Sequence, residues 1–379
     1  MSEALILEQA PDYVRAISPY RAGKRIEELA REYGLEPQDI VKLASNENPL
    51  GMPASAKQAM LAAADDLGRY PDANGFELKA ALAHKHQIPS EWITLGNGSN
   101  DILELAARAF LQPGLGSMYA QHSFAVYALA TQAIGARHQV VPAKALGHDL
   151  EAMLKAIDDD TRIIFIANPN NPTGTFLPED ELRRMLSQVP PRIAVVLDEA
   201  YTDYLPPEVR MDSVAWVREY PNLIISRTLS KAYGLAGLRI GYGIAQEGLS
   251  DLMNRLRQPF NVNSLALAAA TAALRDDAFL ARSYALNRDG LARLQSAFEA
   301  MHLPYLPSFA NFVLVKVGDA AGVYESLLRS GIIVRPVANY GLPEWLRVSV
   351  GLAEENEAFL KALCKATGKS LSLLESTSA

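Results

Sequence analysis

Short apolar runs alternate with amphipathic stretches through the middle of the chain. Five runs rich in apolar and β-branched residues, each bounded by turn residues, predict buried strands at residues 92–95, 162–167, 192–197, 223–226 and 239–244. Apolar positions with helical spacing predict helices between them, at residues 100–111, 179–188 and 211–219. This alternation is typical of an α/β fold in which helices cover a mostly parallel sheet.

The pattern changes toward the end of the chain. An Ala-rich helix is expected at residues 264–274, and a longer helix signal follows it toward Met301. Beyond this point the chain predicts a small sheet and a closing helix, with strands at residues 312–317, 332–336 and 346–350 and the helix at residues 354–366.

A chain of 379 residues is long enough for one large domain and a smaller one. We expect the large domain at residues 50–265, and a smaller α+β domain built from residues 1–49 and 266–379. Hydrophobic residues make up 49% of the chain and charged residues 21%, which is the composition of an ordinary soluble globular protein.

Charge and cysteine content narrow the expected partners and the compartment. The net charge of -7 and the lack of a basic run argue against nucleic-acid binding. The single cysteine, Cys364, excludes an intrachain disulfide and fits the reducing cytoplasm, where it serves as a small apolar residue of a helix. The N-terminus lacks a basic leader, and the longest apolar run, at residues 265–274, is too short to span a bilayer. We therefore expect a cytoplasmic protein without membrane partners.

Metal binding is not expected either. The six histidines are scattered, and the alternation of His84 and His86 fits a solvated helix end. Asp198 and Glu199 have no histidine or third carboxylate beside them.

The segment around Lys231 carries the chemistry that stands out most. Lys231 follows the predicted strand at residues 223–226, and ligands bind at the carboxyl ends of strands in α/β folds. Thr228, Ser230 and Arg239 offer two hydroxyls and a guanidinium to a phosphate. A desolvated lysine beside cations is nucleophilic near neutral pH. Pyridoxal 5'-phosphate (PLP) requires this combination, with Lys231 as a candidate Schiff-base lysine, although the segment alone also fits an ordinary surface loop.

Two turns that follow predicted strands offer further ligands for the same group. In Leu95-Gly-Asn-Gly-Ser-Asn100, the amides of Gly98, Ser99 and Asn100 can face an anion at the positive end of a helix, although a Gly-rich turn needs no ligand. In Asn168-Pro-Asn-Asn-Pro-Thr-Gly174, two prolines fix a loop that can direct the amide of Asn171 toward a ring oxygen. A purely structural Asn-Pro turn is the alternative.

Asp198 ends a strand that is otherwise apolar. A buried carboxylate needs a cationic or donor partner, and a pyridinium N–H would supply one. Three residues later, Tyr201 could donate a hydrogen bond to the phenolate oxygen of the ring. Phe124, in His122-Ser-Phe-Ala-Val-Tyr127, could stack on a flat ring, although an isolated aromatic also fits the core.

Taken together, Asn-Pro-Asn-Asn-Pro-Thr-Gly, Asp-Glu-Ala-Tyr, Ser-Lys-Ala-Tyr-Gly-Leu-Ala-Gly-Leu-Arg and a late Leu-Arg-Val-Ser-Val resemble the aspartate aminotransferase superfamily over nearly the whole chain. The resemblance implies PLP enzymes of fold type I that form homodimers with active sites at the subunit interface. It implies that Lys231 binds the cofactor covalently, Asp198 contacts the pyridine nitrogen, and Asn171 and Tyr201 contact the ring oxygen.

The resemblance also implies how the rest of the cofactor is held. Phe124 would stack on the ring. The phosphate would be bound by Gly98, Ser99, Asn100, Thr228, Ser230 and Arg239. Tyr70, in Arg69-Tyr-Pro-Asp, resembles the tyrosine that one subunit sends to the cofactor phosphate of the other, and a half-buried turn tyrosine is the alternative.

Three segments, at residues 18–24, 43–51 and 334–343, are similar to the histidinol-phosphate aminotransferase family. That family converts imidazole-acetol phosphate and glutamate to histidinol phosphate and 2-oxoglutarate. The similarity implies that Tyr20, Asn46, Arg335 and Arg347 bind substrate. The two arginines with Tyr20 would form an anion clamp for the substrate phosphate, although each arginine also fits a strand-edge salt bridge.

The sequence differs from the family at one place, and three alternative functions compete with this prediction. Arg21-Ala-Gly-Lys24 stands where many members carry Pro-Gly-Lys, which concerns the shape of an N-terminal lid. An aromatic amino acid aminotransferase would use the same cofactor residues, and a PLP-dependent phosphothreonine decarboxylase is similar in size and motifs. A PLP-binding regulator would need a DNA-binding domain, for which the match leaves no room.

Overall fold

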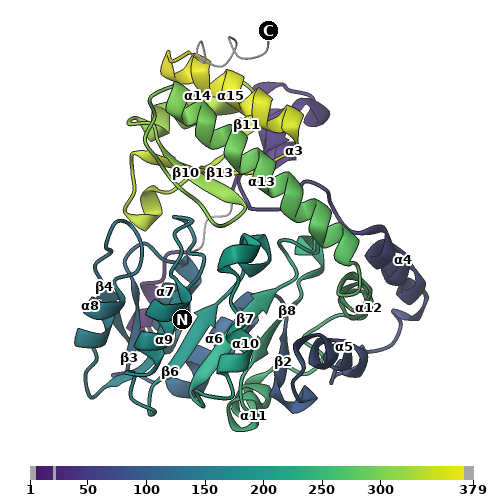
Figure 1. The fold of residues 1–379 in the computed structure, drawn as a ribbon, viewed down its shortest axis with the longest axis vertical. Helices are drawn as coiled ribbons and strands as arrows, with labels where there is room; N and C mark the ends of the chain where they lie inside the picture. Colours follow the sequence, from purple (N-terminus) through teal and green to yellow (C-terminus); the bar gives the residue numbers. More distant parts are fainter. Residues whose placement is uncertain (1–5, 20–22, 371–379) are drawn as a thin grey trace.

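A seven-stranded sheet forms the centre of the larger part of the molecule (Figure 1). The computed structural model describes residues 6–19 and 23–370. The strand order is β2-β8-β7-β6-β5-β3-β4. The strands are β2 (Ile93–Gly96), β3 (Gly116–Ala120), β4 (Arg137–Val141), β5 (Thr161–Ala167), β6 (Ala194–Asp198), β7 (Leu223–Thr228) and β8 (Gly241–Ile244).

Only β8 runs against its neighbours in this sheet. It pairs antiparallel with both β2 and β7, whereas the pairs from β7 to β4 are parallel. Gly241 at the start of β8 is in register with Thr228 at the end of β7 and with Gly96 at the end of β2. The predicted mostly parallel sheet is confirmed, and the carboxyl ends of its parallel strands meet the start of β8 at one edge.

Helices cover both faces of the central sheet, because successive residues of β5 alternate between two apolar clusters. Ile163 and Phe165 pack with residues of α6, α7 and α11, whereas Ile164 and Ile166 pack with residues of α5, α8, α9 and α12. The helices of this part are α4 (Ala54–Ala63), α5 (Phe76–His86), α6 (Ser99–Phe110), α7 (Ala125–Ile134), α8 (Leu150–Lys155), α9 (Glu179–Leu186), α10 (Ser213–Trp216), α11 (Glu247–Leu256) and α12 (Ser264–Ala273).

Several elements differ from the sequence prediction. The edge strand β4 was not predicted, because its residues are half polar and mostly exposed. Strand β3 was not predicted, because it is rich in small residues and contains no β-branched residue. The helix expected at residues 211–219 is confined to α10, because the chain turns after Val217 to enter β7. The strand expected from residue 239 begins at Gly241, because Arg239 has a left-handed backbone with φ of 59°.

A second, antiparallel sheet lies above the first in Figure 1. Its order is β12-β13-β10-β9, and helices pack on it around one apolar cluster that also takes in Leu43. The elements are β9 (Tyr305–Leu306), β10 (Phe312–Lys316), β12 (Arg335–Pro336), β13 (Trp345–Ser349), α13 (Asp277–Ala300), α14 (Ala320–Arg329) and α15 (Ala353–Thr367).

The strand expected at residues 332–336 is divided between two sheets. β11 (Ile332–Ile333) pairs in parallel with β1 (Val41–Lys42), and β12 pairs with β13. The predicted domain division at residues 50 and 265 stays a prediction; the apolar residues of α12 pack within the cluster of the central sheet.

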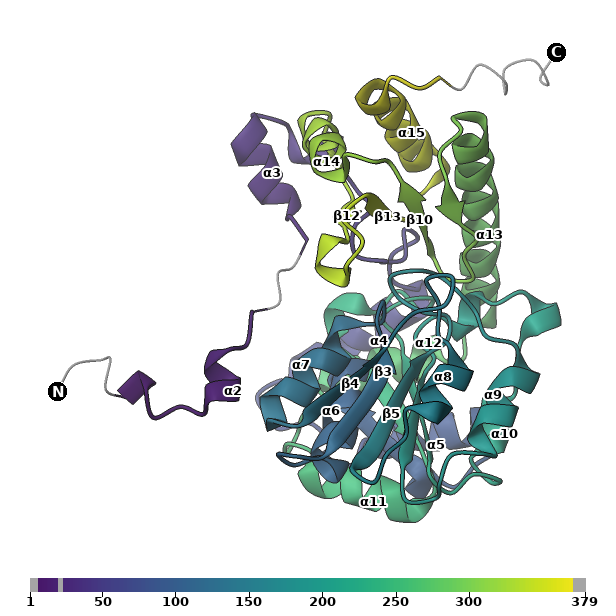
Figure 2. The ribbon, with the colours of Figure 1, turned by 90° about the vertical axis from the view of Figure 1, so that its left-hand side faces the viewer.

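Two helices in the described N-terminal residues contact helices that belong to different parts of the molecule. Helix α2 (Asp12–Arg15) lies beside α7, and α3 (Ile26–Tyr33) lies beside α14 (Figure 2). Gln132 of α7 donates from Nε2 to the carbonyl of Tyr13 at 3.3 Å. Among the residues placed in the structure, no helix combines the length and the apolar composition that crossing a bilayer requires.

Candidate active site

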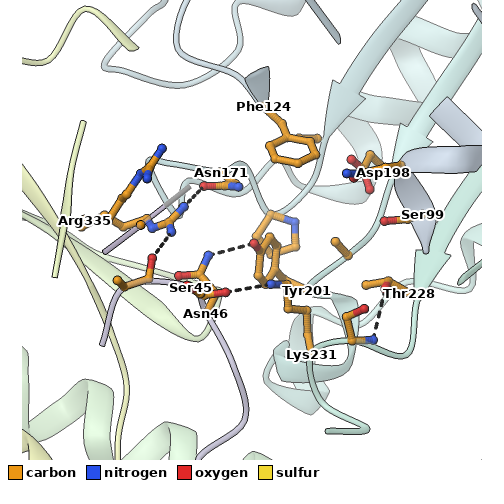
Figure 3. A pocket seen from close by; sticks show the side chains of 18 of the residues that line it. Ser45, Asn46, Ser99, Phe124, Asn171, Asp198, Tyr201, Thr228, Lys231 and Arg335 are labelled. Atoms are coloured by element: carbon orange, nitrogen blue, oxygen red, sulfur yellow. Dashed lines mark hydrogen bonds between the residues drawn. The ribbon is translucent and has the colours of Figure 1, made fainter. Parts of the chain in front are cut away.

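A cavity of about 210 Å³ lies at the edge of the central sheet where the parallel strands end. In Figure 3, Asp198 and Arg335 lie toward opposite ends of this pocket, with Phe124, Tyr201 and Lys231 between them. Most residues that the sequence predicted for the site line the cavity. They are Asn46, Ser99, Asn100, Phe124, Asn171, Asp198, Tyr201, Thr228, Ser230, Lys231, Arg239, Arg335 and Arg347.

Lys231 directs its amine into the pocket from the loop after β7. Its Nζ donates to the backbone carbonyl of Ser45 at 3.1 Å and lies 5.9 Å from the centre of the Tyr201 ring. Burial, together with the positive charge of Arg347, lowers the pKa of Lys231 to about 7. A large share of the amine is therefore unprotonated at neutral pH and able to act as a nucleophile or a base.

Asp198 ends β6 with two carboxylate oxygens in different surroundings. Oδ2 accepts a hydrogen bond from the hydroxyl of Tyr127 at 2.8 Å. Oδ1 is buried and has no hydrogen-bond partner among the described residues. Burial raises the pKa of Asp198 to about 6, against the lowering effect of the Tyr127 hydrogen bond. A buried acceptor left without a donor calls for one from a bound group.

Asn171 and Arg347 form one polar group at the middle of the pocket. Nη1 of Arg347 donates to Oδ1 of Asn171 at 2.5 Å, and Nη2 donates to the carbonyl of Ala44 at 2.7 Å. The face of the Phe312 ring lies 5.2 Å from the guanidinium. Arg347 of the second sheet therefore contacts both the loop after β5, through Asn171, and the segment after β1, through Ala44.

Asn46 and Tyr201 form a second polar pair in the pocket. Nδ2 of Asn46 donates to the hydroxyl of Tyr201 at 2.9 Å. Asn46 has a left-handed backbone with φ of 55°. Its backbone N–H donates to Oγ of Ser349 at 2.8 Å, and the Ser349 hydroxyl donates to Oδ1 of Asn46 at 3.0 Å. Burial raises the pKa of Tyr201 to about 12, so that its hydroxyl keeps its proton and can donate to a ligand.

The turn before α6 forms an open cradle beside Arg239. Gly98 has φ of 85°, and a Cβ placed there would lie 2.5 Å from Nη2 of Arg239. Only glycine therefore fits this turn. Ser99 and Asn100 begin α6, where free backbone N–H groups favour an anion. Thr228 joins the cradle by accepting a hydrogen bond from the amide of Ser230 at 3.1 Å.

Of the predicted residues that the structure describes, Gly98 and Tyr70 do not line the cavity itself. Tyr70 is 82% exposed, and its ring stacks on that of Phe260 with the centres 4.6 Å apart. It is not among the described residues around the pocket. Tyr20 lies outside the described residues.

Among the lining or supporting residues that the sequence did not single out are Gly23, Ser45, Tyr127 and Tyr340. Tyr127 follows Phe124 by one helical turn, a spacing that places both on one face of α7, and this was the available signal. Ser45 acts through its backbone carbonyl, so its side-chain type gives no signal.

The residues of the pocket fit PLP on three observations. The unpartnered Oδ1 of Asp198 matches a ring N–H, the glycine cradle of Gly98 matches a phosphate, and the amine of Lys231 is available at neutral pH. Within residues 6–19 and 23–370, no group of three or more histidine, cysteine or acidic side chains is placed to hold a metal ion.

Residues 38–363 match the sequence profile of the family described as "Aminotransferase class I and II". The chain therefore belongs to the class I and II aminotransferases. Within that class, it is similar to proteins named histidinol-phosphate aminotransferase. The one from Ralstonia nicotianae is 65% identical over 94% of this chain and 96% of its own length, and one from Cupriavidus pinatubonensis is 64% identical over the same shares.

A solved structure agrees with the sequence comparison. The crystal structure of histidinol-phosphate aminotransferase from Sinorhizobium meliloti, in complex with pyridoxal-5'-phosphate, superposes with a TM-score of 0.87 at 28% sequence identity. The match covers 95% of this chain and 98% of the other. The predicted fold, an α/β transferase of fold type I with a mostly parallel sheet, is confirmed.

Proposed function

We propose that this chain is a PLP-dependent aminotransferase that exchanges an amino group between glutamate and imidazole-acetol phosphate, giving 2-oxoglutarate and histidinol phosphate. The names of its relatives at 64% and 65% identity support this substrate pair. The structural observation that carries the proposal is a pair of arginines: Arg335 of β12 is directly opposite Arg347 of β13 in the ladder, and both line the pocket.

Two like charges directly opposite each other are unfavourable in a sheet, and an anion between them would offset this repulsion. Guanidinium groups bind phosphate and carboxylate through paired N–H donors. A substrate phosphate in one half-reaction and the carboxylates of glutamate in the other are anions of this kind. The same clamp therefore serves both substrates of a ping-pong exchange.

The cofactor would be held by residues from both sides of the pocket. Asp198 would accept from the ring nitrogen, Asn171 and Tyr201 would contact the ring oxygen, and Phe124 would stack on the ring. The phosphate would be bound by Gly98, Ser99, Asn100, Thr228, Ser230 and Arg239. PLP, when bound, withdraws electrons from the substrate carbon whose C–H bond breaks.

Lys231 would perform the proton transfers. Its amine, with a pKa lowered to about 7, can remove a proton from the α-carbon of the substrate and return it elsewhere, acting as base and then as acid. The carbonyl of Ser45 accepts from Nζ and holds the amine in the pocket. Arg347, which is fixed by Asn171 and Ala44, orients the anionic end of the substrate while the proton moves.

The visible absorbance of the bound cofactor tests this proposal in single turnovers without a keto acid. We expect rapid bleaching with histidinol phosphate, and none with histidinol phosphate in a Lys231→Ala variant. Equal or faster bleaching with phenylalanine would move the assignment to an aromatic amino acid aminotransferase. Release of CO2 from O-phosphothreonine would move it to a decarboxylase.

We also propose that the chain forms a homodimer with shared active sites in the cytoplasm. Tyr70 is 82% exposed and stacks on Phe260, which is 41% exposed, so this pair is accessible to a second copy. An exposed aromatic pair of this kind is typical of an interaction surface. The single cysteine supports the compartment, because cytoplasmic proteins rarely depend on disulfides.

A further inference from the structure

Tyr127 lies behind the pocket, in the first turn of α7, and contacts the strand that carries Asp198 and the strand beside it. Its ring is fully buried and stacks on Phe165 of β5, with the centres 4.8 Å apart and the planes 8° from parallel. Its hydroxyl donates to Oδ2 of Asp198 at 2.8 Å. The edge of one ring meets the face of the other between Tyr127 and Phe124, with centres 6.0 Å apart.

The hydrogen bond makes the two oxygens of Asp198 unequal. Oδ2 is occupied by Tyr127, whereas Oδ1 is buried with no partner among the described residues. A carboxylate attached through a single χ2 bond rotates freely unless one oxygen is held. Because the Tyr127 ring is fixed by its stack on Phe165, its hydroxyl holds Oδ2 from a rigid support.

We infer that Tyr127 is a positioning residue: it fixes Asp198 so that Oδ1 alone faces the ring nitrogen of the cofactor, and it keeps the carboxyl group ionised there. The inference rests on the proposed function only in that PLP is the cofactor. It assigns no contact between Tyr127 and the substrate.

The electrostatic surroundings agree with this geometry. Burial raises the pKa of Asp198 to about 6, the hydrogen bond from Tyr127 lowers it, and the charge of Glu199 raises it. The other titratable or charged side chains that line the pocket with this carboxyl are Tyr201, Lys231, Arg239, Arg335, Tyr340 and Arg347. Glu199 is paired with Arg227 at 2.8 Å. Of the contacts that favour the charged form of Asp198, the hydrogen bond from Tyr127 is the largest, and the backbone N–H of Ala200 acts in the same direction. Burial raises the pKa of Tyr127 well above its usual value, so the hydroxyl remains a donor.

A Tyr127→Phe variant separates this role from packing, because phenylalanine keeps the stacked ring and removes only the hydroxyl. The apo chain is titrated with PLP and with 1-deazapyridoxal phosphate, in which a C–H replaces the ring nitrogen. We expect the wild-type chain to bind PLP more tightly than the deaza compound. In the variant, the ratio of the two affinities should fall about tenfold, the factor expected for one hydrogen bond to a charged group. The affinity for the deaza compound should stay unchanged.

The matched control is Tyr119→Phe. Tyr119 contacts the Tyr127 ring, with centres 6.4 Å apart, but its hydroxyl pairs with His138 at 2.6 Å and not with Asp198. This control should keep the wild-type preference between the two compounds. The loss in Tyr127→Phe should also be larger near pH 6 than near pH 8.5, because the carboxyl without its donor stays protonated to higher pH.

The inference is overturned if Tyr127→Phe binds both compounds as the wild type does, or loses affinity for both by the same factor, since that would be a packing effect. Thermal unfolding of the apo variant reports whether the fold is intact. Tyr127→Leu, which also lacks the hydroxyl, gives the same comparison if phenylalanine is not tolerated. A wild-type chain that does not bind PLP would overturn the proposed function together with this inference, whereas failure in the variant alone concerns only Tyr127.

Discussion

The amine of Lys231 donates to the backbone carbonyl of Ser45, 3.1 Å away and 186 positions earlier in the chain. Lys231 follows β7 of the central sheet, and Ser45 follows β1, which pairs with β11. A carbonyl oxygen accepts from an amine in either protonation state, so this contact holds the side chain without fixing its charge. The charge is set instead by burial and by Arg347.

The first prediction concerns the pH at which the apo chain takes up PLP. Only the neutral amine attacks, and the pKa of Lys231 is lowered to about 7. The rate of uptake, followed by visible absorbance, should rise through about pH 7 and level off above about pH 8. A lysine with the ordinary pKa of about 10.4 would still gain rate at about pH 9, and that outcome would contradict the assignment.

Replacing Arg347 by glutamine should affect both this midpoint and substrate binding. Its positive charge lowers the pKa of Lys231, so the midpoint for PLP uptake should move to higher pH. Loss of the charged donors should lower kcat/KM for histidinol phosphate by about 10- to 100-fold. Arg329→Gln is the control, because Arg329 is exposed and pairs with Glu325 one helical turn away. An unchanged kcat/KM in Arg347→Gln would remove the arginine from the clamp.

A methyl group at Gly98 should weaken cofactor binding. The Cβ of Gly98→Ala would lie 2.5 Å from Nη2 of Arg239, and φ of 85° adds backbone strain. The guanidinium must move, so the dissociation constant for PLP should rise about tenfold, the factor for one charged hydrogen bond. Gly237→Ala, which meets nothing within 4 Å, should bind PLP as the wild type does. Equilibrium titration of both apo variants decides this.

The buried ion pair beside the site should matter for stability. Nη2 of Arg227 lies 2.8 Å from Oε2 of Glu199, with side chains 15% and 1% exposed. Removing one partner leaves a buried charge without its counterion, so Glu199→Gln should lower the free energy of unfolding by about 3 kcal/mol. Glu219→Gln breaks an exposed pair with Arg183 and should cost less than about 1 kcal/mol. Urea denaturation of the two variants should differ accordingly, and equal costs would refute the prediction.

Mixing two variants that we expect to be inactive alone tests the proposed shared site. A Lys231→Ala chain keeps Tyr70, and a Tyr70→Ala chain keeps Lys231. If Tyr70 serves the partner's cofactor, a hybrid dimer contains one complete site, and activity should appear when the two are denatured together and refolded. Samples refolded separately and then mixed at once are the control. No gain in the hybrid would place Tyr70 outside the partner's site.

Most of the site could be predicted because its residues follow strands. Asp198, Asn171 and Lys231 each come after an apolar run, and parallel strands bring such positions to one edge of a sheet. What could not be predicted depends on distant pairing. The hydrogen bond between Tyr127 and Asp198 joins positions 71 apart, and nothing in the local pattern of α7 indicates which carboxylate the hydroxyl meets.

The same limit applies to the second sheet. A run at residues 332–336 has the composition of one strand, but its halves pair with different partners, β1 and β13. Only the paired strands decide where such a run divides. The left-handed backbone of Asn46 is similar, because the contacts that hold it come from Ser349, 303 positions later.

Because β8 is antiparallel to β7, one short loop between these two strands supplies several residues on the phosphate side of the pocket. Because β8 returns directly beside β7, the residues 229–240 form one closed loop that carries Ser230, Lys231 and Arg239. Its backbone is tied within itself, from Leu229 to Ile240 at 3.1 Å and from Leu235 to Leu229 at 3.0 Å. Closing a short loop costs little entropy. We therefore expect the loop at residues 229–240 to be ordered once the chain has folded, before a ligand binds. The amides of Leu229 and Leu235 should exchange slowly with solvent deuterium whether or not the cofactor is bound.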